Sequence, residues 1–302
     1  MTAAATLTDT DFTDVSAVET LVLTGTSSVT LGTNADTATL DAVTTGAGAT
    51  SVTTENESTA VGINAAALAD GVALTLADTN TAAFTVTNLV GDIVTDAVAG
   101  TLNVTTATVV NSSIQTAAGA TTIGGDATAV AVDAADLADD INLTLNGATN
   151  YTVTALEGNV VAGGSTGTLN ITFDNVTDDE ASIGAGTGNV TVAGGNAGDT
   201  ITVTGLATGG QVFTASTALA AFDITGGATA QNITGSSTAS NTITGGGGAD
   251  TLTGGGGADT FNFASDTDLA AATVAGAGGA DNITMTAAAT LTDTDFTDVS
   301  AV

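Results

Sequence analysis

Two adjacent nine-residue segments hold the residues of this chain that are best suited to chemistry. GGGGADTLT occupies 245–253, and GGGGADTFN follows directly at 254–262. Each segment has glycines in its first half, an aspartate at its sixth position (Asp250 and Asp259) and an apolar residue at its eighth. Glycine permits positive φ and close backbone approach, so the first half predicts a tight turn with exposed carbonyl oxygens. Carbonyl and carboxylate oxygens are the ligands that Ca²⁺ prefers.

Further copies of the pattern lie apart from this pair. GGNAGDTIT (194–202) and GAGGADNIT (276–284) keep the aspartate, as Asp199 and Asp281. Two more segments keep only the apolar position and replace the aspartate by an amide, at Gln231 and Asn241.

The second half of each segment predicts a minimal strand whose apolar side chain points inward. Two segments would complete one winding, so segments n and n+2 would stack and share an ion between their turns. The predicted cation ligands come from the turns and from the sixth position: Asp199, Asn241, Gly245, Gly247, Asp250, Gly254, Gly256, Asp259 and Asp281.

The charge of the chain favours cations as partners. Its 302 residues contain no Lys, Arg or His, and the net charge is −32. Such a chain repels nucleic acids and anionic lipids, so neither is an expected partner. No apolar run reaches the roughly 18 residues of a membrane span. The absence of Cys excludes disulfides and thiolate metal sites and fits a secreted bacterial protein.

The same composition excludes most enzymes. Without His, Cys, Lys or Arg there is no catalytic triad, thiol nucleophile, Schiff base or His-ligated zinc. Paired carboxylates leave a glycosidase as the one remaining class, and Asp178, Asp179 and Glu180 form the densest acidic run. Aromatic residues, which glycosidases use to bind sugars, are only 3% of the chain. We therefore interpret this run as a solvated loop and expect no enzyme.

Short β-like runs must position these turns. Runs such as 72–76, 84–89 and 199–205 alternate β-branched and polar residues and are separated by Gly, Asn, Asp or Thr. The pattern predicts an all-β chain, namely a parallel β-helix or β-roll solenoid. The alternative is a series of β-sandwich modules with a short β-roll. Residues 64–110 and 133–177 resemble each other and predict two copies of one β unit.

The ends of the chain repeat each other. Residues 285–302 are identical to residues 1–18, which gives a period of 284 residues. We expect an arbitrary cut from a tandem array, although an overlap added to a single-copy domain would give the same sequence. The predicted organisation is a β-strand-repeat region at 1–185, a Gly-rich region at 186–284 and, at 285–302, the start of the next repeat.

The nonapeptides at 245–262 resemble the RTX family of Ca²⁺-binding parallel β-rolls. The runs ADTFNFASDTDL (258–269) and GGADNITMTAAATLTDTDFTDVSAV (278–302), which continue into VETLVLTGTSSVTLGTNA (18–35) once the repeat is closed, are similar to repeats of large bacterial β-strand-repeat surface proteins and to the S-layer proteins of some Gram-negative bacteria. This resemblance implies Ca²⁺ as cofactor, export from the cell and assembly with other copies of the chain.

Three functions follow in order of preference. The first is a structural extracellular protein that self-assembles into a surface layer or fibre stabilised by Ca²⁺, located at the bacterial cell surface. The second is a repetitive adhesin stalk that projects a distant ligand-binding domain. The third, far behind, is a Ca²⁺-dependent two-carboxylate glycosidase.

Overall fold

In the computed structural model the chain is almost entirely β-structure. The structure describes residues 4–56, 60–79, 81–108, 110–174 and 181–302. These residues form two compact units, Met1–Thr152 and Val153–Val302, with the boundary inside strand β15 (Asn150–Leu156). The acidic run 178–180 lies outside the described residues, so the glycosidase hypothesis for it stays untested.

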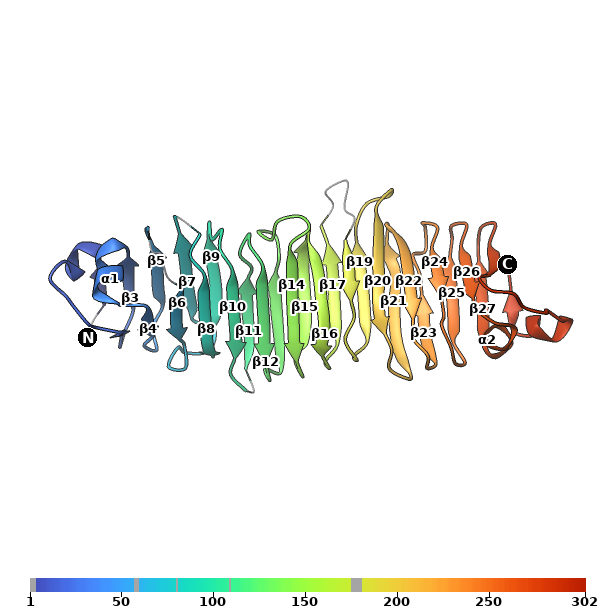
Figure 1. Ribbon diagram of the computed structural model, residues 1–302, viewed down its shortest axis with the longest axis horizontal. Helices are drawn as coiled ribbons and strands as arrows, with labels where there is room; N and C mark the ends of the chain where they lie inside the picture. The colour runs from blue at the N-terminus through green and yellow to red at the C-terminus, as the bar shows by residue number, and fades with distance from the viewer. Residues whose placement is uncertain (1–3, 57–59, 80, 109, 175–180) are drawn as a thin grey trace. The chain divides into compact units, whose positions relative to one another are not determined.

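The first unit contains two parallel sheets in which successive strands alternate (Figure 1). Its odd-numbered sheet contains β1 (Ala5–Leu7), β3 (Ser27–Leu31), β5 (Thr50–Thr54), β7 (Ala73–Asp78), β9 (Asp92–Asp96), β11 (Asn111–Gln115) and β13 (Ala129–Asp133). Its even-numbered sheet contains β2 (Thr20–Val22), β4 (Ala42–Thr44), β6 (Val61–Asn64), β8 (Phe84–Leu89), β10 (Leu102–Thr106), β12 (Thr121–Gly125) and β14 (Asn142–Gly147).

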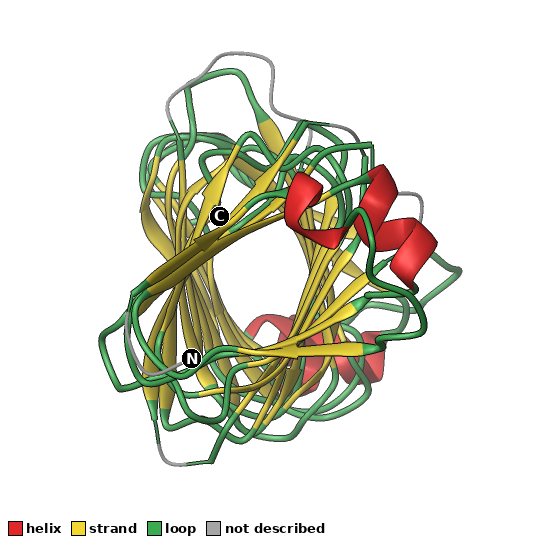
Figure 2. Ribbon diagram, turned by 90° about the vertical axis from the view of Figure 1, so that its left-hand side faces the viewer, coloured by secondary structure: helices red, strands yellow, loops and turns green. Residues whose placement is uncertain are grey.

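The second unit repeats this arrangement. Its odd-numbered strands are β17 (Leu169–Phe173), β19 (Val190–Gly194), β21 (Gln211–Ala218), β23 (Gln231–Thr234), β25 (Thr251–Gly255), β27 (Thr273–Ala277) and β29 (Val299–Ser300). Its even-numbered strands are β16 (Asn159–Ser165), β18 (Ser182–Gly184), β20 (Thr200–Leu206), β22 (Ala221–Gly226), β24 (Thr242–Thr244), β26 (Thr260–Phe263) and β28 (Asn282–Met285). Viewed along the stack, the strands lie in two layers joined by loops (Figure 2).

The core consists of apolar side chains in register from strand to strand. In the even-numbered sheet of the second unit Ile224 is opposite Ile243, and Ile243 is opposite Phe261. In the odd-numbered sheet Leu252 is in register with Val274. All five are almost completely buried. Because a strand alternates its side chains between two faces, every second residue adds to such a ladder, at about 1.5–3 kcal/mol for each buried large side chain.

Four short helical segments interrupt the loops in the described ranges. They are the 3₁₀ helices η1 (Asp9–Phe12) and η2 (Asp293–Phe296) and the α-helices α1 (Thr33–Ala38) and α2 (Asp266–Ala271). Ser265 caps α2 by accepting a hydrogen bond from the backbone N–H of Asp268 at 3.1 Å. Elsewhere the half-turns of the second unit are closed by loops and hydrogen-bonded turns.

The predicted solenoid is confirmed. The strands of both units run parallel to their partners, whereas the strands of β-sandwich modules pair mainly antiparallel, so the sandwich alternative is wrong for the described residues. Of the two similar segments, 64–110 contributes β7 to the odd-numbered sheet, whereas 133–177 contributes the corresponding strand β14 to the even-numbered sheet. Strands of similar sequence therefore lie in different sheets. The boundary predicted at 185 stays a prediction.

No helix in the described part of the chain has both the length and the apolar character needed to cross a membrane.

Candidate metal centre

The nonapeptides form the loops that lead into successive strands. Residues 245–250 lead from β24 into β25, and residues 254–259 lead from β25 into β26. Consecutive repeats therefore enter different sheets, and each loop stacks on the loop two half-turns away. The backbone N–H of Gly247 donates to the carbonyl of Gly227 at 2.9 Å, and that of Gly278 donates to the carbonyl of Gly255 at 2.8 Å.

The residues at the sixth position of the repeats lie in two columns. The even-edge column contains Asn241, Asp259 and Asp281, each directly before an even-numbered strand and in register with the next. The odd-edge column contains Gln211 and Gln231, the first residues of β21 and β23, and Asp250, directly before β25, each in register with the next. In the sequence, Gln231 and Asn241 stand where other repeats have aspartate. In the structure they also occupy positions equivalent to those aspartates, because they lie in register with Asp250 and Asp259.

Only the even-edge column brings two predicted aspartates next to each other. The loop 254–259 stacks on the loop 276–281, although thirteen residues, 263–275, separate the two nonapeptides in the sequence. The backbone N–H of Asp259 donates to Oδ1 of Asp281 at 2.8 Å. One step back, the backbone N–H of Asn241 donates to Oδ1 of Asp259 at 2.7 Å. Each carboxylate thus uses one oxygen to hold the preceding turn.

The second oxygen of each carboxylate lacks a partner. Oδ2 of Asp259 and Oδ2 of Asp281 are buried and accept no hydrogen bond. A buried charged oxygen without a partner is costly, and the chain has no Lys, Arg or His side chain to neutralise it. A cation from solution satisfies both oxygens, so these residues fit Ca²⁺.

The first glycine of each repeat makes room for the carboxylate of the same repeat. A Cβ placed on Gly245 would lie 2.7 Å from Oδ2 of Asp250, and a Cβ on Gly254 or Gly276 would collide with Oδ2 of the aspartate five residues later. The spacing from the first glycine to the aspartate is therefore a packing requirement as well as a source of turn geometry.

Burial raises the pKa of Asp259, and the neighbouring charge of Asp281 raises it further, against the lowering effect of the hydrogen bonds from Asn241. Burial also raises the pKa of Asp250, which in addition faces the charge of Asp268 and accepts a hydrogen bond from the backbone N–H of Gln231. Both carboxyl groups are more costly to ionise than exposed aspartates, which a bound cation reverses.

Backbone oxygens must complete any cation shell. The described residues contain no group of three or more His, Cys, Asp or Glu side chains placed to hold a metal ion. Ca²⁺ takes six to eight oxygen ligands, so Asp259 and Asp281 supply part of the shell, and carbonyl oxygens of the loops 254–258 and 276–280 would supply the rest.

The remaining predicted ligands are placed differently. Asp250 is buried in the odd-edge column, where its neighbours in register are Gln231 and Ala272. Asp199 is buried too, but it is in register with Ala220, and its Oδ2 accepts the backbone N–H of Asn196 at 2.7 Å. Within the part of the chain that the structure describes, these two aspartates therefore have no carboxylate in register beside them.

The two inner glycines differ from each other. A Cβ on Gly247 would have no atom nearer than 3.6 Å, whereas one on Gly256 would collide with the carbonyl oxygen of Ser237 in the stacked loop. The carbonyl oxygens of Gly245, Gly247, Gly254 and Gly256 stay predicted ligands.

Sequence reasoning missed Asp268, whose charge acts on Asp250 from the next loop of the same edge. That loop contains α2 in place of a glycine repeat. The signal was present as the capping pattern Ser265-x-x-Asp268, in which the serine side chain caps the helix and also donates to the aspartate.

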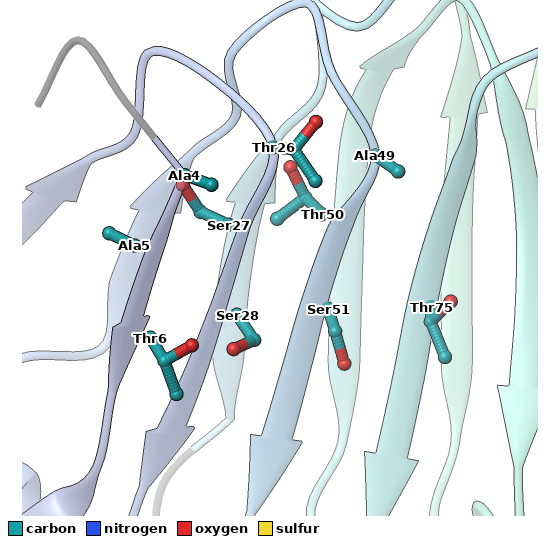
Figure 3. A pocket seen from close by; sticks show the side chains of 10 residues that line it. All are labelled: Ala4, Ala5, Thr6, Thr26, Ser27, Ser28, Ala49, Thr50, Ser51 and Thr75. Atoms are coloured by element: carbon teal, nitrogen blue, oxygen red, sulfur yellow. The ribbon is translucent and has the colours of Figure 1, made fainter.

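A hollow in the first unit is lined by residues of other types than the candidate metal centre. It lies on the outer face of the odd-numbered sheet of the first unit, where Thr6, Ser28, Ser51 and Thr75 follow one another in register (Figure 3). Its lining consists of Ala, Ser and Thr and includes no carboxylate, so it is not a second candidate for the cation.

Comparison with known proteins identifies the same region. The family model described as RTX calcium-binding nonapeptide repeat (4 copies) matches residues 235–270. No curated protein and no solved structure matches the chain. The matched residues include Asn241, Asp250 and Asp259 with their loops. Residues 235–270 therefore match RTX calcium-binding nonapeptide repeats, and they lie within a β-solenoid.

Proposed function

We propose that this chain is a structural extracellular protein that self-assembles into a surface layer or fibre, with Ca²⁺ bound between its turns. The Ca²⁺ part rests on the RTX repeats and on the unpartnered oxygens of Asp259 and Asp281. We place the Ca²⁺ between the loops 254–258 and 276–280, with both carboxylates as ligands. When bound, the ion neutralises the two carboxylates and joins two successive windings.

The assembly part rests on one observation, the two environments of an identical segment. In the first copy, η1 packs against α1, which follows it, and Phe12 is 7% exposed. In the second copy, η2 packs against α2, which precedes it, and Phe296 is 41% exposed. The same eighteen residues thus pack against a following helix in one copy and against a preceding helix in the other.

The contacts of Asp9 show how the copied segment holds the helix that follows it. Its carboxylate accepts backbone N–H groups of Gly32, Asn34 and Ala35 at 3.0–3.1 Å and so caps the start of α1. Asp293 is the same residue in the second copy. We infer that a turn equivalent to 19–40 packs on 285–302, caps on Asp293 and covers Phe296.

A parallel solenoid favours this role, because each winding offers its open strand edge to the next. The absence of Cys and the RTX repeats, which are typical of secreted proteins, favour a location outside the cell. A repetitive adhesin stalk would use the same fold without self-association into a lattice.

Negative-stain electron microscopy of the chain with Ca²⁺ and with EDTA tests the proposal. We expect ordered sheets or uniform filaments in Ca²⁺ and their loss in EDTA. As a matched pair, Phe296→Asp should prevent assembly, whereas Val161→Asp, at an exposed residue on β16 away from the copied segment, should not. Isolated particles in Ca²⁺ would contradict self-assembly and favour the adhesin-stalk hypothesis. Hydrolysis of any member of a glycan panel would favour the glycosidase hypothesis.

A further inference from the structure

The side chain of Asn241 has an unusual set of neighbours. Its Nδ2 lies 3.2 Å from the carbonyl oxygen of Ser236, 3.0 Å from that of Ala239 and 3.3 Å from that of Gly254. It also lies 2.8 Å from Oδ1 of Asp259. One nitrogen with two hydrogens is thus surrounded by four oxygens, one of them charged. Such a set of oxygens is typical of a cation site.

The orientation of the amide is fixed by its partners. Oδ1 of Asn241 accepts the backbone N–H of Ser236 at 3.1 Å, while the NH₂ group faces acceptors alone. A flipped amide would place its oxygen against four oxygens. The side chain is 2% exposed, so water does not replace these contacts.

Asp259, the next residue in the even-edge column, places an acceptor where Asn241 places a donor. Nδ2 of Asn241 lies against the first glycine of its own loop, 2.8 Å from a Cβ placed on Gly235. Oδ2 of Asp259 lies in the same way against Gly254. At Asn241 this place holds a donor that satisfies the oxygens around it. At Asp259 it holds an acceptor that stays without a partner.

The odd-edge column changes in the same direction along the chain. Nε2 of Gln211 donates to the carbonyl oxygens of Gly186 and Gly188, at 2.9 and 2.7 Å. Gln231 accepts the backbone N–H of Gly227 and donates to the hydroxyl of Thr229. Both amides are buried and close their loops, and the next residue in register is the carboxylate of Asp250. On each edge an amide therefore lies in register beside a carboxylate, Gln231 beside Asp250 and Asn241 beside Asp259.

We propose that Asn241 is a built-in substitute for a bound cation: its NH₂ group occupies the oxygen-lined place that takes Ca²⁺ one winding further on, between Asp259 and Asp281. The amide holds the winding together without metal and ends the run of Ca²⁺ sites. This inference rests on the proposed binding of Ca²⁺ at Asp259 and Asp281.

The test is Asn241→Asp, which turns the donor into a second carboxylate beside Asp259. We expect N241D to bind one more Ca²⁺ per chain than the wild type in isothermal titration calorimetry. Without metal it should melt at a lower temperature than the wild type, because two carboxylates then face each other, and Ca²⁺ should reverse this loss. The matched control is Asn232→Asp, an exposed residue on β23 that gains the same charge, which should bind the same number of ions as the wild type.

A second variant distinguishes between Asn241 as a substitute for Ca²⁺ and Asn241 as a ligand of Ca²⁺. Asn241→Ala removes the NH₂ group and should lower the melting temperature by the same amount in Ca²⁺ and in EDTA. A loss confined to Ca²⁺ would make Asn241 a ligand and overturn the inference, as would a folded N241D with no additional ion. A wild-type chain that binds no Ca²⁺ in the same titration would instead overturn the proposed function.

Discussion

At the scale of single residues, the main feature is that carboxylates are buried in a chain that has no Lys, Arg or His side chain to neutralise them. Asp259 shows this most clearly, since it is fully buried and only one of its two oxygens has hydrogen-bond partners. In most proteins a Lys or Arg would neutralise such a group, and here we propose that an ion from solution does so. The same position with an amide, Asn241, needs no ion.

The first prediction concerns pH. The pKa of Asp259 is raised in the folded chain, so without metal the folded state holds this proton more tightly than the unfolded state does. The contribution to stability is complete below the ordinary aspartate pKa and is lost as pH rises through the raised value. The metal-free melting temperature should therefore fall as the pH rises above the ordinary aspartate pKa, more steeply in the wild type than in Asp259→Asn.

The control for this experiment is Asp223→Asn, at an exposed residue on β22. It removes one charge from the same general repulsion and should keep the steep wild-type slope. Equal slopes in all three proteins would show that Asp259 titrates as an ordinary exposed aspartate. With Ca²⁺ bound the sign should reverse, because acid protonates the ligand and weakens ion binding.

At the scale of elements, the nine-residue spacing predicts much of what is seen. Leu252 and Phe261 at the eighth position point into the core, and the glycine turns lead into the strands. The partner of the loop 254–259 was not predictable, because it depends on the length of the intervening half-turn. That half-turn contains α2 in place of a fifth repeat, and it brings 276–281 rather than a neighbouring copy onto 254–259.

The internal similarity of 64–110 and 133–177 was likewise visible in the sequence, but its consequence was not. Strand β7 lies in the odd-numbered sheet and its counterpart β14 in the even-numbered one. Both sheets are parallel and alternate their side chains in the same way, so the same pattern suits either sheet. Nothing in a single strand's sequence specifies which sheet it enters.

The second prediction concerns the loops and compares two glycines. In Gly254→Ala the new Cβ collides with Oδ2 of Asp259 and lies 2.7 Å from its Cγ, so the whole carboxylate must move. We expect a loss of about 1–3 kcal/mol in the free energy of unfolding and at least roughly tenfold weaker Ca²⁺ binding, which corresponds to about 1.4 kcal/mol. Gly247→Ala, with its nearest atom at 3.6 Å, should stay within about 1 kcal/mol of the wild type.

Urea unfolding and calcium titration of the two variants measure both effects. Equal losses in the two glycine variants would argue that the turns need glycine only for backbone freedom, and that the approach of Asp259 to Gly254 has no part in binding.

At the scale of the whole molecule, the solenoid depends on contacts between neighbouring windings. Because a strand of three to five residues does not fold alone, each winding is stabilised by the next one. A net charge of −32 opposes this stacking, and Ca²⁺ reduces the opposition where two carboxylates meet. The central claim is therefore that Ca²⁺ bound between two windings stabilises the fold.

Thermal unfolding followed by far-ultraviolet circular dichroism, in Ca²⁺ and in EDTA, tests this claim most directly. We predict that the melting temperature rises with the Ca²⁺ concentration, with a gain in free energy of about 2.7 kcal/mol at a hundredfold excess over the dissociation constant. The double variant Asp259→Asn, Asp281→Asn should lose this dependence. An identical melting curve of the wild-type chain in Ca²⁺ and in EDTA would contradict the account.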